Sequence, residues 1–570
     1  MPRLWIDNRE VNVPPGSTLL AAARSLGLDV PALCYREGLR PNTSCMVCVM
    51  KVLDGSDGAT ERRSDDGSAV NSGRMVPSCA TAAQEGMRVE SETEEVRQVR
   101  RASLELLLSD HAGECRAPCQ YACPFDTDVP RMIRQIAAGR IADAIITLRN
   151  DVPLPAVLAR LAPDVCENGC RRGRADAAVA IGLLKRHAAD KGLASPTAHA
   201  LTNKPNSAMR VAIVGAGPAG LSAAYFLLRM GHACTLFDAG PEPGGSLRAI
   251  PEQQLPREVL AAEIALIEQL GARFELNATV RQPGANVAAG PRTGRSLEEL
   301  WREFDAVLLA VGRTGIDGEL GIPAMKDGLD VDRTTHETRF PGVFAAGDVV
   351  RPRGQPVHAA VDGKAAAVCI DQYLRGVPIT GHPKLVALGT GYPPKEEVAA
   401  LMVDATPAGR VTPADAGAGL NDEEARAEAQ RCLHCDCRKL DGCKLRRYAE
   451  MYGAEARRYR GVRRAAERVS THPDIVYEPG KCILCGLCVQ IAEQEREPLG
   501  LTFVGRGFDV KVAVPFDESL GEALKAAARR CIEACPTGAL SWKTESSGGV
   551  DQACAEDMRH GSADGLEPKQ

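Results

Sequence analysis

The sequence predicts a multidomain α/β protein in which cysteine-rich modules flank one nucleotide-binding domain. Three observations support this fold class. The chain has 570 residues, enough for roughly three to five ordinary domains. A glycine-rich turn between an apolar strand and a helix begins a βαβ pattern near residue 208. All of the 21 cysteines except Cys234, Cys369 and Cys554 lie in clusters on either side of that domain.

Composition excludes several classes of protein. Apolar residues make up 44% and charged residues 25%, and the formal net charge is -5, so the chain has no net cationic field for nucleic acid or anionic lipid. The N-terminus lacks the pattern of a secretory signal, and no apolar run of 18 residues occurs. We therefore expect a cytoplasmic protein with no membrane insertion and no nucleic-acid partner. Clustered cysteines in a reducing compartment favour metal binding over disulfides.

Residue patterns divide the chain into six segments. Residues 1–95 show short strands and one capped helix, and residues 96–205 show apolar residues at helical spacing. The predicted nucleotide-binding domain spans 206–378. Residues 379–424 are rich in Pro, Gly and Ala and predict a linker. Cysteines return in 425–545, and the polar residues 546–570 predict a disordered tail.

The nucleotide fingerprint lies between the strand VAIV and the helix LSAAYFLL. It is a G-x-G-x-x-G turn, followed about 20 residues later by an acid at the end of the next strand: Gly215, Gly217, Pro218, Ala219, Gly220 and Asp238. The glycines permit a tight turn and close backbone approach, and the helix N-terminus favours a pyrophosphate. The acid is expected to bind ribose hydroxyls. These features predict a Rossmann-like domain.

Two later segments favour FAD over NAD. The segment AGPEPGGSLRAIPEQQLPREV resembles the stretch that covers the flavin in the glutamate synthase small-subunit family. The resemblance implies that Gly244, Gly245 and Arg248 contact FAD. The segment TRFPGVFAAGDVV is similar to the motif with which FAD-dependent pyridine nucleotide oxidoreductases close over the ribityl chain, which implies contacts from Gly347 and Asp348.

The sequence departs from that family in one respect. Relatives carry a second nucleotide domain for NAD(P)H between the AVG strand and the Gly-Asp motif. Only about 30 residues separate these two features here, too few for a domain of that size, and no second glycine fingerprint occurs. We expect the NAD(P)H site to be missing, so that the flavin exchanges electrons with clusters or a partner. A directly acting NAD(P)H-dependent oxidoreductase is the alternative.

The first cysteine group, called the N-terminal set, predicts a [2Fe–2S] cluster. One loop supplies three thiols at C-x10-C-x2-C spacing and a remote strand supplies the fourth: Cys34, Cys45, Cys48 and Cys79. Four cysteines suit such a cluster, and this spacing fits a zinc ribbon less well. The segment resembles the N-terminal module of the complex I large iron–sulfur subunit and of iron hydrogenases, which implies a β-grasp ferredoxin-like fold.

The second group falls in the helical segment. Its members are Cys115, Cys119, Cys123, Cys166 and Cys170. The segment is similar to the helical domain of glutamate synthase small subunits and dihydropyrimidine dehydrogenase, which holds two [4Fe–4S] clusters. The resemblance implies one cluster on Cys123, Cys166 and Cys170, yet Leu158 and Ala162 stand where relatives have Cys. For the other, His111 could join Cys115 and Cys119, as in the His-x3-Cys of complex I. A partly empty domain is the alternative.

The third group is compact. Its members are Cys432, Cys435, Cys437 and Cys443. The C-x2-C-x-C-x5-C spacing is compatible with zinc or with an iron–sulfur cluster, and we favour a cluster. His434 lies among these thiols and is expected near the metal without binding it.

The fourth group, called the C-terminal set, matches a bacterial ferredoxin and predicts one [4Fe–4S] cluster in an α+β module. Its members are Cys482, Cys485, Cys488 and Cys535. A second cluster is not expected, because Ala492, Lys525 and Ala528 occupy ligand positions. Cys531 is left over.

Together these features predict an oxidoreductase subunit that relays electrons between FAD and iron–sulfur clusters. The resemblance implies partners of hydrogenase, dehydrogenase or synthase type, or a ferredoxin. A rival hypothesis is a redox-inactive scaffold or sensor. A basic segment could dock an acidic partner or form a solvated helix face: Arg446, Arg447, Arg457, Arg458, Arg460, Arg463 and Arg464.

Overall fold

The computed structural model divides the chain into two compact units. It describes all residues except 54–72, 163–164, 195–203, 282–292, 316–323, 326–327, 383–397, 399–400, 403–404, 416, 440–441, 460, 462–463, 465–466 and 544–570. The first unit takes its described residues from Met1–Arg116, Leu385–Ala400 and Asp436–Gln570. The second takes them from Ala117–Lys384 and Leu401–Cys435.

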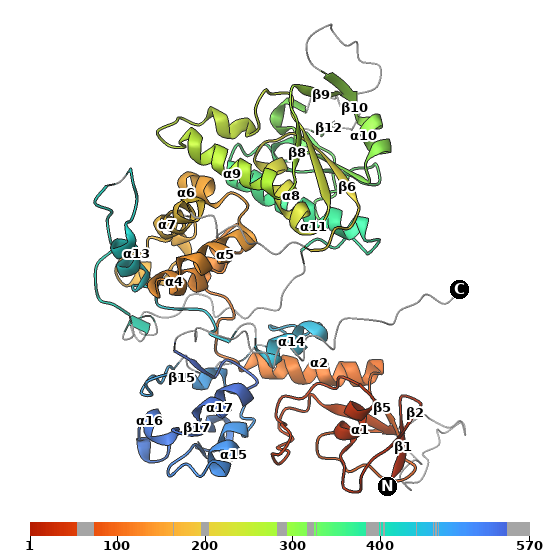
Figure 1. Ribbon diagram of the computed structural model, residues 1–570. Helices are drawn as coiled ribbons and strands as arrows, with labels where there is room; N and C mark the ends of the chain where they lie inside the picture. The colour runs from red at the N-terminus through yellow and green to blue at the C-terminus, as the bar shows by residue number, and fades with distance from the viewer. Residues whose placement is uncertain are drawn as a thin grey trace. The chain divides into compact units, whose positions relative to one another are not determined.

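The first unit begins with a mixed five-stranded sheet and one helix (red in Figure 1). Its elements are β1 (Arg3–Ile6), β2 (Arg9–Asn12), α1 (Leu19–Ser25), β3 (Val49–Leu53), β4 (Gly73–Pro77) and β5 (Arg88–Glu90). The strand order is β2-β1-β5-β3-β4, and only the β1–β5 pairing is parallel. Thr18 caps α1, whose buried leucines pack with Leu4 and Ile6. The predicted strands and capped helix of residues 1–95 are thus present.

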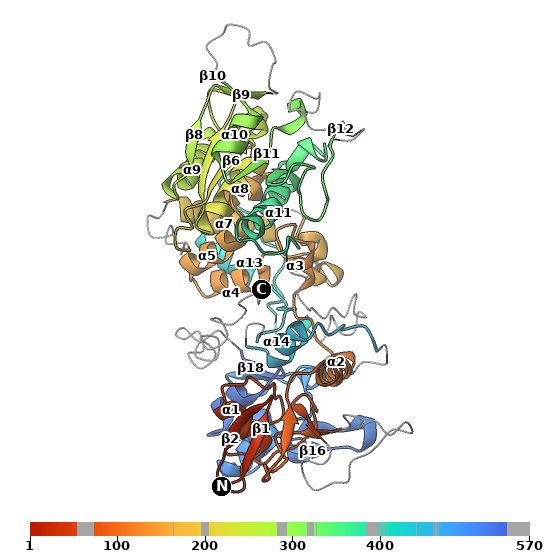
Figure 2. The same cartoon turned by 90° about the vertical axis from the view of Figure 1, so that its right-hand side faces the viewer.

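The rest of the first unit combines helices with two short antiparallel strand pairs. Its elements are α2 (Glu94–Ser109), α14 (Lys444–Met451), β15 (Ile475–Tyr477), η7 (Pro479–Lys481), α15 (Leu487–Gln494), β16 (Thr502–Val504), η8 (Gly507–Asp509), β17 (Lys511–Ala513), η9 (Pro515–Asp517), α16 (Leu520–Ala523), α17 (Ala528–Ala534) and β18 (Leu540–Trp542). β15 pairs with β18, and β16 pairs with β17. Figure 2 shows these elements from a second direction.

The second unit contains a group of helices that holds the remaining cysteines. Its elements are α3 (Pro118–Ala122), α4 (Val129–Ala137), α5 (Ile141–Asp151), α6 (Pro155–Leu161), η1 (Glu167–Gly169), η2 (Arg171–Arg174), α7 (Ile181–Ala194) and α13 (Asp422–Ala429). The apolar faces of α4, α5, α6 and α7 form one core, as their spacing of apolar residues predicts.

The second unit also contains a five-stranded parallel sheet of order β14-β11-β6-β7-β8. Its elements are β6 (Arg210–Val214), α8 (Pro218–Arg229), β7 (Ala233–Phe237), η4 (Gly245–Ala249), α9 (Arg257–Gln269), β8 (Arg273–Glu275), β9 (Ala278–Arg281), β10 (Thr293–Ser296), α10 (Leu297–Glu303), β11 (Ala306–Leu309), η5 (Gly312–Gly315), β12 (Ala324–Met325), β13 (Gly328–Leu329), β14 (Val343–Ala345), η6 (Gly347–Val349) and α11 (Pro356–Leu374). Gly363 lets α11 approach α8, because a Cβ there would lie 2.1 Å from the Ala219 carbonyl oxygen.

Two predicted segments are divided between the units. α2 lies in the first unit, although the sequence grouped it with the helices of residues 96–205. Its fully buried Arg100 donates hydrogen bonds to the carbonyl oxygen of Val49 and to the hydroxyl of Tyr452, which holds α2 between β3 and the segment after α14. The third cysteine group is also divided, because the boundary falls between Cys435 and Cys437.

No helix in the described part of the chain combines the length and the apolar character needed to cross a bilayer.

Candidate redox sites

The glycine fingerprint forms a tight turn between β6 and α8. Gly215 has a φ of +107°, and a Cβ on Gly220 would lie 1.9 Å from the Gly215 carbonyl oxygen, so neither position has room for a side chain. A Cβ on Gly217 would meet only the Cα of Gly245, at 3.9 Å. Pro218 is the first residue of α8, and no side chain caps the helix at Gly217. The turn therefore leaves open space at an uncapped helix N-terminus, which fits a dinucleotide pyrophosphate.

Asp238 fixes this turn. Its Oδ2 accepts a 2.7 Å hydrogen bond from the backbone N–H of Ala216, and its Oδ1 accepts one of 2.7 Å from Gly240. The carboxylate thus joins the ends of β6 and β7 directly. The contact with ribose that the sequence predicts stays a prediction.

The segments expected to cover the flavin lie against the fingerprint. Gly244 donates from its backbone N–H to the carbonyl oxygen of Ala216 at 2.8 Å, and Gly245, with a φ of +50°, lies beside Gly217. Arg248 donates from Nε to the carbonyl oxygen of Pro243 at 2.6 Å. These contacts bring η4 to the turn, as an FAD contact requires.

The Gly-Asp motif follows β14, which is the edge strand of the parallel sheet opposite β8. A Cβ on Gly347 would lie 2.8 Å from the Cβ of Ala219, so this glycine allows η6 to touch the start of α8. Asp348 accepts a 3.1 Å hydrogen bond from the backbone N–H of Gly354. The predicted FAD residues therefore converge from four separate segments on one end of the parallel sheet, where the fold family places its ligands.

The N-terminal set is a compact group of buried thiols. Cys34, Cys45, Cys48 and Cys79 are each 3% exposed or less. Hydrogen bonds from Cys45 and then Cys79 lower the pKa of Cys34 to about 2. A hydrogen bond from Cys79 lowers the pKa of Cys48 to about 6, while the pKa values of Cys45 and Cys79 are raised, chiefly by their bonds to Cys34. All four predicted ligands are therefore close together.

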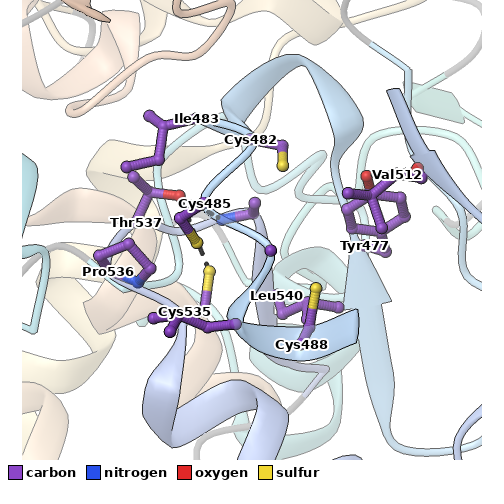
Figure 3. Close-up of a pocket in the computed structure, with 13 residues that line it drawn as sticks. Tyr477, Cys482, Ile483, Cys485, Cys488, Val512, Cys535, Pro536, Thr537 and Leu540 are labelled. Atoms are coloured by element: carbon purple, nitrogen blue, oxygen red, sulfur yellow. Dashed lines mark hydrogen bonds between the residues drawn. The ribbon is translucent and has the colours of Figure 1, made fainter. Parts of the chain in front are cut away.

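The C-terminal set surrounds a pocket (Figure 3). Cys482, Cys485, Cys488 and Cys535 all line it, and Figure 3 shows Cys485 and Cys535 pointing toward one another. Tyr477 also lines this cavity, and its hydroxyl donates to the carbonyl oxygen of Val512 at 2.7 Å. The backbone N–H of Leu484 donates to the sulfur of Cys482 at 3.4 Å, a bond that favours the thiolate.

Cys531 does not line this cavity. It is fully buried, its thiol faces the carbonyl oxygen of Cys488 at 3.6 Å, and burial raises its pKa to about 12. It packs as a core thiol, in agreement with its interpretation as a leftover cysteine.

The loops that carry the N-terminal and C-terminal sets are in direct contact within the first unit. The side-chain amide of Asn42 donates to the carbonyl oxygens of Leu484 and Cys485, at 3.3 Å and 3.1 Å. Arg40 and Gln490 exchange hydrogen bonds of 2.9 Å and 3.0 Å. The charge of Cys34 also contributes to raising the pKa of Cys485, although burial is the main cause. The two sets are therefore neighbours.

A third grouping in the first unit was not predicted as a whole. We call it the His–Cys set: His111, Cys115, Cys437 and Cys443. Burial, followed by the charges of Cys437 and Cys115, raises the pKa of Cys443 to about 12, and the charge of Cys115 acts on Cys437 as well. Lys481 ties His111 into this group.

A Cβ on Gly113 would meet both Lys481 Cε and His111 Nε2, at 2.8 Å and 3.3 Å, and Lys481 is the largest opposing charge on Cys437. Lys481 is buried, and its ammonium contacts Glu478 at 2.5 Å. A buried cation that no sequence motif selected therefore lies beside the His–Cys set.

The second unit brings together four other cysteines, which we call the second-unit set. One pocket is lined by Cys119, Cys170, Cys432 and Cys435. The sequence assigned them to two different groups. The backbone N–H of His434 lies 3.5 Å from the sulfur of Cys432, the same i to i+2 relation seen at Cys482 and Leu484.

Buried arginines explain how residues so distant in sequence meet. Arg172 and Arg431 are both completely buried. Arg172 donates to the carbonyl oxygen of Arg431 at 2.5 Å and forms paired bonds with Asp176. Arg431 donates to Glu428 at 2.8 Å. One feature of the sequence could have suggested the regrouping. Cys435 and Cys437 are separated by a single residue, and two cysteines at this spacing can belong to different sites.

The last two cysteines of the helical segment lie apart from these sets. Cys123 and Cys166 contact the ammonium of Lys185, at 3.5 Å and 3.0 Å. Leu158 and Ala162 line the same cavity. The three-cysteine grouping expected from the sequence is therefore split, because Cys170 belongs to the second-unit set.

Other predicted features have plain structural roles. Cys234 and Cys369 are buried in the core, as predicted, and Cys554 lies outside the described residues. In the basic segment, Arg446, Arg447, Arg458 and Arg464 form ion pairs with acids of the first unit, and Arg460 and Arg463 lie outside the described residues. Among the described residues, no three His, Cys, Asp or Glu side chains converge on a single metal ion.

Three family models match successive parts of the chain. Residues 3–94 match the 2Fe-2S iron-sulfur cluster binding domain. Residues 91–196 match dihydropyrimidine dehydrogenase domain II, 4Fe-4S cluster. Residues 184–363 match the pyridine nucleotide-disulphide oxidoreductase model. These matches confirm the predicted [2Fe–2S], [4Fe–4S] and FAD-type oxidoreductase domains.

Curated relatives cover part of the chain. It is 35% identical over 271 residues to the NADPH-Fe(3+) oxidoreductase subunit beta of Geobacter sulfurreducens, covering 45% of this chain and 37% of that protein. It is 37% identical over 269 residues to the NADP(+)-dependent formate dehydrogenase subunit beta of Moorella thermoacetica, covering 41% and 36%. It is 36% identical over 221 residues to the NAD-dependent dihydropyrimidine dehydrogenase subunit PreT of Escherichia coli, covering 37% and 50%. The chain thus spans half or less of the length of these relatives.

Proposed function

We propose that this protein is an FAD- and iron–sulfur-dependent oxidoreductase subunit that relays electrons between its flavin and its clusters within a larger redox complex. The observation that carries the proposal is the direct contact between the loops of the N-terminal and C-terminal sets, made by Asn42 and Cys485. Electron transfer needs neighbouring redox centres, and a purely structural metal site does not. The relatives named as subunits of redox enzymes support the same class of function.

The proposed cofactors follow from the four sets. The N-terminal set holds a [2Fe–2S] cluster, for which four thiolates from one loop and one strand are suited. The C-terminal set, the His–Cys set and the second-unit set each hold a [4Fe–4S] cluster. Four cysteines line one pocket in the C-terminal set and in the second-unit set, and the three cysteines of the His–Cys set interact electrostatically. In every set the mutual repulsion of the thiolates would be relieved by cationic iron.

Three proposed clusters lie in the first unit, and their order follows from electrostatic contacts. The charge of Cys535 acts on Cys443 of the His–Cys set, and the charge of Cys34 acts on Cys485 of the C-terminal set. The C-terminal cluster would therefore stand between the other two. This arrangement supports a linear relay from the His–Cys cluster to the [2Fe–2S] cluster.

The flavin would convert between two-electron and one-electron steps, which is the chemistry that FAD supplies when bound. The chain's own residues hold its pyrophosphate at Gly217 and the start of α8 and close over it with η4 and η6. We propose that the flavin exchanges electrons with the clusters and with a partner subunit, in a cytoplasmic complex whose reducing surroundings keep the cysteines available.

A direct NAD(P)H-dependent oxidoreductase is the second candidate. The names of the three relatives include NADPH, NADP(+) and NAD, which favours a nicotinamide nucleotide in their reactions. The roughly 30 residues between β11 and β14 favour the first candidate, because they are too few for a second nucleotide domain.

The deciding experiment uses the full chain purified anaerobically. Iron, sulfide and FAD are quantified, and stopped-flow absorbance follows the flavin after mixing with NADH or NADPH. We expect one FAD, one [2Fe–2S] cluster and three [4Fe–4S] clusters, with no rapid flavin bleaching by either nucleotide. Rapid bleaching would establish the second candidate. Electron paramagnetic resonance (EPR) would follow the reduction of the clusters by dithionite. Clusters that dithionite cannot reduce would instead support a redox-inactive scaffold or sensor.

A further inference from the structure

Two cysteines of the second unit share one ammonium group. Lys185 Nζ lies 3.0 Å from the sulfur of Cys166 and 3.5 Å from the sulfur of Cys123. The two thiols also hydrogen-bond each other, and Cys123 contacts the hydroxyl of Thr127 at 3.4 Å. Cys123 and Cys166 are only 5% and 4% exposed. We call this arrangement the cysteine–lysine site.

The cysteine–lysine site faces a pocket lined mainly by apolar side chains. Its walls include Phe125, Leu148, Val152, Leu158, Ala162 and Val357. Among the described residues that line it, Lys185 is the only charged group and the two cysteines are the only thiols.

This donor set does not fit the [4Fe–4S] cluster that the matched domain model implies. A cluster requires four ligands, and the cavity offers two thiols. A protonated lysine has no lone pair with which to bind iron. The position next to both sulfurs is taken by that ammonium, and Leu158 and Ala162 add only carbon.

We propose that Cys123 and Cys166 form a redox-active dithiol that exchanges with a small disulfide entering the apolar cavity. Lys185 is the positioning residue that holds the attacking sulfur as a thiolate. Two thiols within hydrogen-bonding reach can close into a disulfide with little movement of the backbone. A single ammonium between them favours the one-thiolate state that thiol–disulfide exchange requires.

The exchange balances in two steps. The Cys123 thiolate attacks one sulfur of the small disulfide, so that a mixed disulfide forms and the other half leaves as a thiolate. Cys166 then loses its proton and attacks the Cys123 sulfur, forming the Cys123–Cys166 disulfide and releasing the second half. The two cysteines give up two electrons, the small disulfide takes them, and the Cys166 proton leaves with one of the two released thiols.

Electrostatics at the site agree with these roles. The hydrogen bond from Cys166 and the charge of Lys185 lower the pKa of Cys123 to about 4, against the effect of burial. The pKa of Cys166 is raised, first by its bond to Cys123 and then by burial. Burial alone would lower the pKa of Lys185, but the charges of Cys123 and Cys166 raise it overall. These directions agree with a pair that carries one thiolate beside the ammonium of Lys185.

The test equilibrates the full chain, purified anaerobically with its cofactors, in buffers of reduced and oxidised glutathione. Free thiols are then alkylated and the peptides analysed by mass spectrometry. We expect Cys123 and Cys166 to lose alkylation together as the buffer becomes more oxidising, while the buried Cys234 remains alkylated after unfolding in every buffer. A Cys166→Ser chain should accumulate glutathione on Cys123.

Substitutions at Lys185 test its positioning role. Lys185→Met should slow disulfide formation by roughly tenfold or more, because less thiolate is present at Cys123. Lys185→Arg keeps the positive charge and should restore most of the rate. A purely structural lysine would leave the rate unchanged in both chains, provided that they retain their FAD.

Iron content separates this inference from the proposed relay. Cys123→Ser should keep the full iron and sulfide content, whereas Cys435→Ser should lose one cluster. The dithiol proposal is overturned if Cys123 and Cys166 stay alkylatable in all buffers, or if Cys123→Ser loses iron together with an EPR signal. Neither readout depends on whether electrons pass from flavin to clusters. The test of the dithiol would therefore remain valid if the relay proposal failed.

Discussion

The guanidinium of Arg172 donates a 2.5 Å hydrogen bond to the carbonyl oxygen of Arg431, and both arginines are completely buried. Arg172 lies two residues after Cys170, and Arg431 immediately precedes Cys432. This single contact therefore joins two cysteine segments that are about 260 residues apart in sequence. It connects the two segments that carry the second-unit set.

Arg172→Met should abolish the cluster of the second-unit set. The change leaves the carbonyl oxygen of Arg431 buried without its donor, a loss that costs about 1–3 kcal/mol, and it frees the Cys432 loop. EPR and iron analysis should show one [4Fe–4S] cluster fewer. Substitution of the exposed Arg174 by Met is the control and should keep all clusters. An Arg172→Met chain with its complete iron content would contradict this role.

Cys435→Ser and Cys437→Ser should remove different clusters, although only one residue separates them. Cys435 lines the cavity of the second-unit set, and Cys437 belongs to the His–Cys set. We expect two distinct EPR signals to disappear, and the double variant to lose both. If both single variants lose the same signal, the four cysteines from Cys432 to Cys443 hold one cluster, as the sequence alone had favoured.

Asn42→Ala should slow electron transfer between the N-terminal and C-terminal clusters. The side chain donates to two carbonyl oxygens across the loops, and the loss of these bonds should destabilise the contact by about 1 kcal/mol. Freeze-quench EPR would follow the two clusters after rapid reduction. Asn12→Ala, on the exposed face of β2, is the matched control. Equal transfer rates in both chains would show that Asn42 does not hold the two loops together.

Gly217→Ala should lose FAD without unfolding. The position has an ordinary φ of -83°, and its new Cβ would meet protein only at 3.9 Å, so the methyl group enters the space expected for the pyrophosphate. We expect FAD content to fall at least tenfold, while the thermal stability of the FAD-free chain is unchanged. Gly409→Ala, where a Cβ meets nothing within 4 Å, should keep its FAD. A Gly217→Ala chain that retained its full FAD content would show that the dinucleotide binds elsewhere.

Glu263→Gln should change how stability depends on pH. Burial raises the pKa of Glu263 to about 7, where its Oε1 accepts a 2.6 Å hydrogen bond from the backbone N–H of Ala156. The folded chain therefore holds this proton up to a higher pH than the unfolded chain does. Stability should fall by about 3 kcal/mol as pH rises from the unfolded pKa to about 7, and then level off.

Glutamine keeps the acceptor for Ala156 and carries no charge, so this part of the pH dependence should vanish. Denaturant unfolding at about pH 5 and about pH 8 would compare the two chains. Glu258→Gln, on the exposed side of α9, should behave as the unchanged protein does. A Glu263→Gln chain that loses as much stability as the unchanged chain between the two pH values would exclude ionisation at this site.

Local patterns in the sequence determined the elements and the chemistry of this protein. The G-x-G-x-x-G turn predicted β6, α8 and the FAD-type domain, because backbone clearance at Gly215 and Gly220 depends only on neighbouring residues. The sequence grouped the cysteines of the N-terminal and C-terminal sets as the structure groups them, since each set is built mainly from one loop whose spacing is fixed by the chain. The identities of these cysteines already indicated iron–sulfur chemistry.

Only the tertiary structure decided which of the remaining cysteines belong together. Cys435 and Cys437 are separated by one residue, yet they lie in different units, because Arg172 and Glu428 bind the chain before Cys435 while Lys481 and Gly538 lie beside Cys437. Lys185 and Lys481 were selected by no motif, since a buried cation acquires its role from the thiols around it. Spacing along the chain determines a site when its ligands share one loop, and long-range packing determines it when they do not.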